Sequence, residues 1–343
     1  MNRKQSVWAT IRHLVKRLKP YLRWAILGGT LFFLVETLLT HWEDVASIRI
    51  DLSGWACLAI ALGTTLLAHI WSGWVWSLIL RELHQPASGV WGILVYLKTN
   101  IAKYLPGNVW HFYGRVWASK AAGYSLEAST LSVLLEPLLM AAAALLVALI
   151  SGQRANLILK IVGLLGVLAI VHPRILNGLL RYVGRLKGYT KPNPNPETDP
   201  PPSDRPAEMT EPPPLNIRQY PLRPLLGELI FLGLRSAGFL WVVFALESIE
   251  LRDIPALISA FSVAWLLGLV IPGAPGGIGV FEATAIALLE GQFSTGLILS
   301  SVAVYRLIST LAEAGGAGLA WLDERLNLTL AQEPVNQSGN LES

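Results

Sequence analysis

Residues 86–112 read PASGVWGILVYLKTNIAKYLPGNVWHF, and residues 255–281 read PALISAFSVAWLLGLVIPGAPGGIGVF. Both stretches follow the pattern Pro-x19-Pro-Gly-x-[Val/Ile]-x-x-Phe. Each hydrophobic run ends at a Pro-Gly turn, because proline cannot donate a backbone hydrogen bond and interrupts a helix. A tryptophan-bearing apolar run precedes each stretch, and an apolar run that contains a glutamate follows it. We interpret the two stretches as an internal repeat; chance similarity in sequence rich in glycine and proline is the alternative.

The composition predicts a membrane protein. Hydrophobic residues make up 53% of the 343 residues and charged residues only 15%, and the mean hydropathy is +0.48. A water-soluble globule needs more polar surface than this, and helices satisfy their own backbone in lipid, so we expect an all-α integral membrane protein. Crossing the bilayer takes about 20 apolar residues. Runs near or above that length lie at 22–40, 52–80, 128–150, 155–171, 225–249 and 296–321.

Two further segments are hydrophobic but unsuited to a simple span. Residues 87–105 contain Lys98, Asn100 and Lys103, which are too polar for a helix that faces lipid. Residues 255–271 are apolar, yet they run directly into a Pro-Gly turn. We therefore predict about six transmembrane helices plus two re-entrant Pro-Gly hairpins. In the alternative topology, residues 255–271 cross the membrane fully and the carboxyl terminus lies outside.

The distribution of basic residues predicts the orientation. Residues 1–23, 81–127 and 172–224 together contain 20 Lys and Arg, whereas the alternate loops contain three. Since cytoplasmic loops carry the excess of positive charge, the amino terminus and the linker are predicted to be cytoplasmic in a bacterial inner membrane. The first hairpin then enters from the cytoplasm and the second from outside, which makes the halves an inverted repeat. Transporters with such repeats hold their substrate near the bilayer midplane.

Five regions follow from these patterns. Ten prolines between residues 192 and 214 mark an extended linker. We expect a basic amphipathic interfacial helix at residues 1–20, a first membrane half at 21–171, a cytoplasmic amphipathic helix and Pro-rich linker at 172–221, a second membrane half at 222–325, and a disordered tail at 326–343.

Charged residues inside apolar runs are the candidates for substrate binding, since each costs roughly 2.5–3.5 kcal/mol at the centre of a span unless it pairs or faces water. Glu136, Arg306 and Glu313 either form structural ion pairs or handle a ligand or proton. Glu282 either caps a helix or binds substrate, and Glu228 lies close enough to a span end to snorkel. The candidates on the two turns and near them are Asn100, Lys103, Tyr104, Pro106, Gly107, Arg115, Glu136, Pro275, Gly276, Gly277, Glu282, Arg306 and Glu313.

Several kinds of chemistry have no motif in this sequence. There is no Gly-x4-Gly-Lys-[Ser/Thr] phosphate loop for ATP. The six histidines are scattered and Cys57 is the only cysteine, so we predict no metal site, no cofactor and no catalytic residue. The basic residues do not form one aromatic-interleaved domain, which argues against nucleic acid as a partner.

The segment Asn100–Asn108, with Arg115 and Glu136 downstream, and the segment Pro272–Glu282 resemble the lysylphosphatidylglycerol synthase transmembrane-region family. This is the flippase-like membrane half of the multiple peptide resistance factor. The resemblance covers roughly residues 20 to 325 and is to a stand-alone member of the family. It implies a bacterial inner-membrane protein that moves or binds anionic or modified phospholipids or polyprenoid-type lipids. Full-length synthases carry a soluble aminoacyl-transferase domain after the membrane region, whereas this sequence ends at Ser343 shortly after the last predicted span, so lysyl transfer is not predicted.

We therefore expect a lipid translocase or a lipid-binding transport component whose partner is membrane phospholipid. In this hypothesis the headgroup phosphate meets Arg115 or Arg306, and Arg115 serves alternatively as a positive-inside anchor. Two other functions are left open: a membrane enzyme acting on a lipid-linked substrate, and a non-transporting subunit of a membrane complex. A homodimer or a membrane partner protein is also left open.

Overall fold

The computed structural model describes residues 50–104, 109–150, 157–175, 177–178, 220–271, 277 and 279–332. The all-α class is confirmed: the elements of this part of the chain are helices, besides one isolated β-bridge between Glu290 and Phe293. The features predicted at residues 1–20, 22–40 and 179–219 lie outside the described residues. The helices are α3 (Leu52–Glu82), α4 (Gly89–Asn100), η1 (Ile101–Tyr104), α5 (Trp110–Ala121), α6 (Leu126–Ile150), α7 (Leu157–Val171), α9 (Leu222–Leu246), η4 (Leu251–Asp253), α10 (Ile254–Val270), α11 (Val280–Leu289) and α12 (Thr295–Gln332).

Five helical segments of the described chain are long and apolar enough to cross a membrane. Four of them, α3, α6, α9 and α12, coincide with predicted spans, so the multi-pass membrane architecture is confirmed. The fifth, Leu251–Val270, is the segment whose topology the sequence left open. The span predicted at 155–171 is the short helix α7, which packs against α6.

The central helices α3 and α9 lie side by side and run in opposite directions. Near the start of α3, Gly54 packs on the carbonyl of Ala245 at the end of α9. Further along α3, the indole of Trp71 donates a hydrogen bond of 2.8 Å to the carbonyl of Gly227 near the start of α9. Gly227 itself packs against Val75, where a Cβ would lie 2.6 Å from the valine side chain. Small residues therefore allow the two helices to approach closely.

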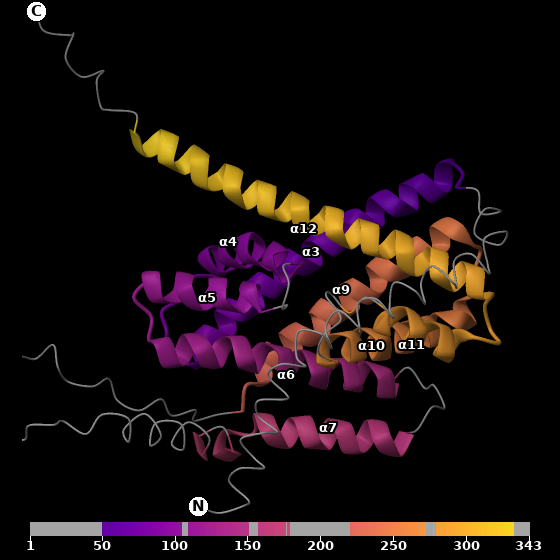
Figure 1. The fold of residues 1–343 in the computed structure, drawn as a ribbon, viewed down its shortest axis with the longest axis horizontal. Coiled ribbons are helices and arrows are strands. Elements are labelled where there is room, and N and C mark those ends of the chain that lie inside the picture. The colour runs from indigo at the N-terminus through magenta and orange to yellow at the C-terminus, as the bar shows by residue number, and fades with distance from the viewer. Residues whose placement is uncertain are drawn as a thin grey trace, which may run out of the picture.

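The packing of the other helices is exchanged between the two halves. α4 packs against α12, and α10 packs against α6. Likewise, α3 contacts α12 and α9 contacts α6, whereas α5 packs on α6 and α11 on α12 within their own halves. Figure 1 shows α4 and α5 toward one end of the molecule and α10 and α11 toward the other. With α3 and α9 antiparallel, this exchange is what an inverted repeat requires.

The two interrupted hairpins meet α12 near the middle of its length. The hydroxyl groups of Tyr104, the last residue of η1, and Thr310 lie 3.2 Å apart. Arg306, one turn earlier on α12, donates a hydrogen bond of 3.0 Å to the carbonyl of Gly277. Thr310 is about 22 Å along the helix from its first residue, at 1.5 Å per residue. Both chain interruptions therefore lie at mid-length of the bundle; their entry into the bilayer as re-entrant hairpins stays a prediction.

The outer surface of the bundle carries many exposed apolar side chains. α7 exposes Ile158 by 79% and Leu165 by 61%, and α12 exposes Leu307 by 60%. Such side chains are tolerated when hydrocarbon, and not water, surrounds them.

The first turn of α3 has a side-chain cap. α3 begins at Leu52 because Asp51 accepts a hydrogen bond of 2.7 Å from the amide of Gly54. This hydrogen bond lowers the pKa of the Asp51 carboxyl.

Candidate functional site

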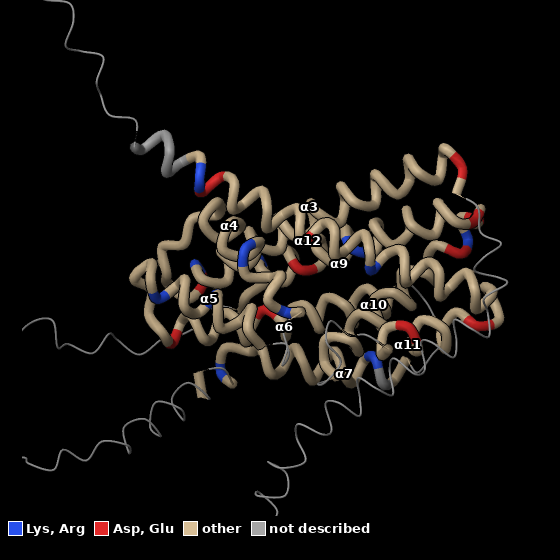
Figure 2. Tube along the Cα trace, turned by 45° about the horizontal axis from the view of Figure 1, so that its top comes forward, with Lys and Arg blue, Asp and Glu red and all other residues tan. Residues whose placement is uncertain are grey.

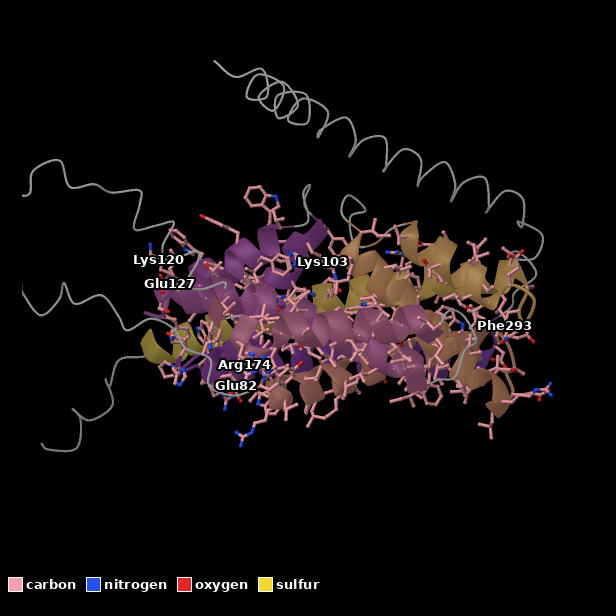
Figure 3. All side chains as sticks on the ribbon, turned by 90° about the horizontal axis from the view of Figure 1, so that it is seen from below. Glu82, Lys103, Lys120, Glu127, Arg174 and Phe293 are labelled. Carbon is pink, nitrogen blue, oxygen red and sulfur yellow. The ribbon has the colours of Figure 1, made fainter. Side chains whose placement is uncertain are left out.

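Charged residues lie both at the ends of the helix bundle and near the middle of its length. Figure 2 shows them at the ends of the helices and in a further group at mid-length, among α12, α9 and α6. In Figure 3, Lys103 lies about midway between the end with Lys120 and Glu127 and the opposite end with Phe293. The mid-length residues form three clusters, which we name after their ion pairs.

The Arg115 cluster joins α5 to α6. Nη1 of Arg115 lies 2.5 Å from Oε2 of Glu136, and each side chain is 2% exposed. The guanidinium also covers the ring of Tyr96 at 3.7 Å, while the hydroxyl of Tyr96 accepts a hydrogen bond of 2.8 Å from Ser72. The pair is thus sealed between α4, α5 and α6.

Glu228 lies beside this cluster and is completely buried. Neither of its carboxyl oxygens has a hydrogen-bond partner among the described residues. The expectation that Glu228 snorkels to a span end is wrong, because the first turns of α9 pack against α3 and α6 and hold residues 225 and 228 in the interior. Sequence position alone did not reveal this burial.

The Lys103 cluster connects η1, α3, α9 and α12. Nζ of Lys103 lies 2.5 Å from Oε1 of Glu313, and Nε2 of His69 lies 3.2 Å from the same oxygen. Ser309 links this group to Arg235, whose Nη1 donates a hydrogen bond of 2.8 Å to the serine hydroxyl. The Lys103 side chain is 22% exposed, whereas Glu313 is 1% exposed. A buried carboxylate therefore pairs with a lysine whose side chain is partly exposed.

The Arg306 cluster joins α12 to the start of α11. Nε of Arg306 bonds Oε1 of Glu282, and its Nη2 lies 3.2 Å from Oε2. Oε2 of Glu282 also accepts a hydrogen bond of 2.6 Å from the amide of Gly279, so Glu282 caps α11. The cap expected as one alternative for Glu282 is thus present, and Glu282 also forms an ion pair with Arg306. The Arg306 side chain is 29% exposed.

The structure brings most of the predicted site residues to this level. Asn100 is buried at the end of α4, and Tyr104 is 40% exposed next to Thr310. Arg306 and Glu313 are seven residues, or two helical turns, apart on one face of α12, but each pairs with a residue of another element. Pro106, Gly107, Pro275 and Gly276 lie outside the described residues.

Two functional candidates, His69 and Arg235, were not among the predicted site residues. Arg235 had a sequence signal, since a lone arginine within an apolar span implies a buried partner. His69 had none, because a single histidine in a helix is common in packed interiors. Among the described residues, no group of three or more His, Cys, Asp or Glu side chains could hold a metal ion.

A family model identifies the kind of membrane protein to which these clusters belong. The model described as the lysylphosphatidylglycerol synthase TM region matches residues 21–313. The chain belongs to this family. A comparison with curated proteins finds no match. The matched range contains all three ion-pair clusters, so they are part of a lipid-related membrane component of the lysylphosphatidylglycerol synthase TM family.

Proposed function

We propose that this member of the lysylphosphatidylglycerol synthase TM family binds the headgroup of an anionic phospholipid at mid-length of the bundle and moves it across the bacterial inner membrane. The observation that carries the proposal is the pair of basic residues with partly exposed side chains, Lys103 and Arg306, at the level where both hairpins are interrupted. A phosphate needs such cations once it leaves the aqueous interface.

The hydroxyl groups near these cations suit a phosphate as well. Thr310 lies on α12 one turn from Arg306 and is exposed, and its hydroxyl contacts that of Tyr104. Hydroxyl donors complement the charge of Lys103 and Arg306 at a phosphate, whose oxygens accept several hydrogen bonds. We therefore assign the phosphate to the surface formed by Lys103, Tyr104, Arg306 and Thr310. Arg115, which is 2% exposed, is a positioning residue in this proposal.

The ion pairs allow the phosphate to enter without stranding a buried charge. When a phosphate takes Lys103, Glu313 still has His69 at 3.2 Å and Ser309 as partners. Likewise, Glu282 keeps the amide of Gly279 when Arg306 turns to a phosphate. Leaving a buried charge with no partner is costly, so this second set of partners lowers the barrier to exchange.

The test is translocation of headgroup-labelled phosphatidylglycerol in proteoliposomes, read with a membrane-impermeant quencher. Lys103→Gln should reduce the initial rate at least about tenfold, the change that loss of roughly 1.4 kcal/mol of phosphate binding produces. Lys98→Gln is the matched control, because Lys98 is a lysine of the same hairpin whose partner, Glu324, is 54% exposed. The control should keep the wild-type rate.

A wild-type rate in folded Lys103→Gln protein would remove the phosphate site from the mechanism. No lipid movement in the wild-type protein, with product formed from a lipid-linked substrate, would instead indicate an enzyme. Native mass spectrometry of co-purified lipid then separates binding from movement: the Lys103→Gln variant should retain less phosphatidylglycerol than the Lys98→Gln variant.

The orientation in the inner membrane is part of the proposal. Lys120 and Arg174 lie toward the same end of the bundle in Figure 3, opposite Phe293. The excess of positive charge at that end favours the cytoplasm. Since α12 begins beside Phe293, its carboxyl-terminal end then faces the cytoplasm. A tag inserted after Leu330 should be inaccessible to label outside intact cells, and labelling there would reverse the topology.

A further inference from the structure

Glu228 is a buried acid that the phosphate site does not use. Its exposed fraction is 0%, and in the described part of the structure both carboxyl oxygens lack a hydrogen-bond partner. An ionised carboxylate in such surroundings is strongly disfavoured, because neither water nor a donor replaces its hydration. The group therefore needs either a proton or a cation.

A second acid, Glu136, lies at the same level on the neighbouring helix. α6 packs against α9, with Met140 in contact with the cluster of Phe231, and Leu139 in the cluster that contains Leu225. Leu225 and Phe231 lie on either side of Glu228 in α9, and Leu135, which belongs to the cluster of Leu225, directly precedes Glu136 in α6. Oε1 of Glu136 also has no hydrogen-bond partner in the described residues, whereas its Oε2 is bound by Arg115.

The charges around the two acids do not balance if both are ionised. The charged groups that act on Glu228 are Glu136 from α6 and Arg115 from α5. α3 contributes the neutral indole of Trp71, which bonds the carbonyl of Gly227, and α10 has no charged residue between Ile254 and Val270. α12 and α4 contribute Glu313, at the separate Lys103 cluster, and the neutral phenol of Tyr96. Two carboxyl groups thus share one cation.

We propose that Glu228 and Glu136 form a proton-binding site inside the membrane, which holds one exchangeable proton while Arg115 balances the remaining carboxylate. A carboxylate and a proton combine to the neutral acid and separate again, so no other reactant is needed. The proton is preferred to a sodium ion because the guanidinium of Arg115, 2.5 Å from Glu136, repels a metal cation, whereas a proton binds covalently and leaves a neutral acid.

The proton site contacts the first hairpin directly through Arg115. Arg115 belongs to α5, and its bond to Glu136 is the ion pair that ties α5 to α6. Loss of the proton adds negative charge beside Arg115 and tightens this tie, whereas uptake of the proton weakens it. Coupling of the proton to headgroup movement rests on the proposed function, but the proton site itself does not.

Infrared difference spectroscopy of the purified protein in H2O and D2O tests the site without any lipid assay. A buried protonated carboxyl gives a carbonyl stretching band that shifts on deuteration. The wild-type protein should show this band near neutral pH. Both Glu228→Gln and Glu136→Gln should abolish it, because Arg115 then balances the single carboxylate that is left. Glu247→Gln, the same change at the exposed end of α9, is the matched control and should retain the band.

The remaining outcomes each decide the proposal. A wild-type protein without the band, or a band that persists in folded Glu228→Gln protein, would overturn it. A band that appears only when sodium is withdrawn would assign the site to a metal cation and overturn it too. If the band behaves as expected while Lys103→Gln keeps full translocation, the proton site stands and the phosphate site fails. A rate that responds to a pH gradient in the wild type and not in Glu228→Gln would show the coupling.

Discussion

The ion pairs Arg115–Glu136 and Glu282–Arg306 occupy corresponding places in the two halves, yet they differ in charge order and in burial. In each, a short helix after a Pro-Gly turn is tied to the long helix that follows it. The arginine belongs to the short helix in the first half and to the long helix in the second. The first pair is sealed, whereas the Arg306 side chain is 29% exposed. Each half thus has an ion pair that joins its short helix to the following long helix, but only the pair of the second half has a partly exposed side chain.

The largest effect should follow removal of the sealed arginine. Arg115→Met leaves Glu136 and Glu228 buried without a cation, so the free energy of unfolding should fall by about 3–5 kcal/mol. Unfolding by sodium dodecyl sulfate in mixed micelles measures this change. The double variant Arg115→Met/Glu136→Leu should recover most of the loss, because Glu228 is then the single acid at the site and stays neutral by keeping its proton. Failure to recover would show that the pair acts mainly through its packing.

The accessible pair should tolerate the same substitution better. Arg306→Met leaves Glu282 with the amide of Gly279, and solvent or headgroups reach the site, so we expect a loss of only about 1–2 kcal/mol. Measured in the same micelles, a loss equal to that of Arg115→Met would remove the distinction between a sealed and an accessible half.

The spans and turns of the two halves could be predicted from the sequence, but the ion-pair partners could not, for a physical reason. Spans and turns are local: α6 follows from an apolar run, and the interruption before α11 from proline and glycine. Ion pairs are not local, since Lys103 and Glu313 are 210 residues apart and meet only when η1 packs on α12. Glu228 shows the limit most clearly. Its nearness to a span end suggested solvent access, but α3 and α6 cover that end of α9.

A substitution at Gly277, in the turn of the second half, should lower the free energy of unfolding by an intermediate amount. Gly277 has a positive φ of 72°, and a Cβ there would lie 2.9 Å from the Cα of Gly268 in α10. Gly277→Ala should therefore cost about 1–3 kcal/mol through backbone strain and the contact with α10. Gly233→Ala in α9 is the control, because no atom lies within 4 Å of its added methyl group and alanine favours the helix. If Gly277→Ala is no less stable than the Gly233→Ala control, the close approach of α10 to the turn is contradicted.

The smallest effect concerns α7, which packs on α6 and has no counterpart in the described second half. Its Lys160 donates a hydrogen bond of 3.1 Å to the carbonyl of Ala148, which also accepts one from Ser259 of α10. Lys160→Met keeps the apolar stem, and Ser259 still bonds the carbonyl, so the free energy of unfolding should change by less than about 1 kcal/mol. Translocation should be unchanged, because the site at Lys103 and Arg306 lies on other helices. A large loss of translocation would instead make α7 part of the pathway and break the correspondence between the two halves.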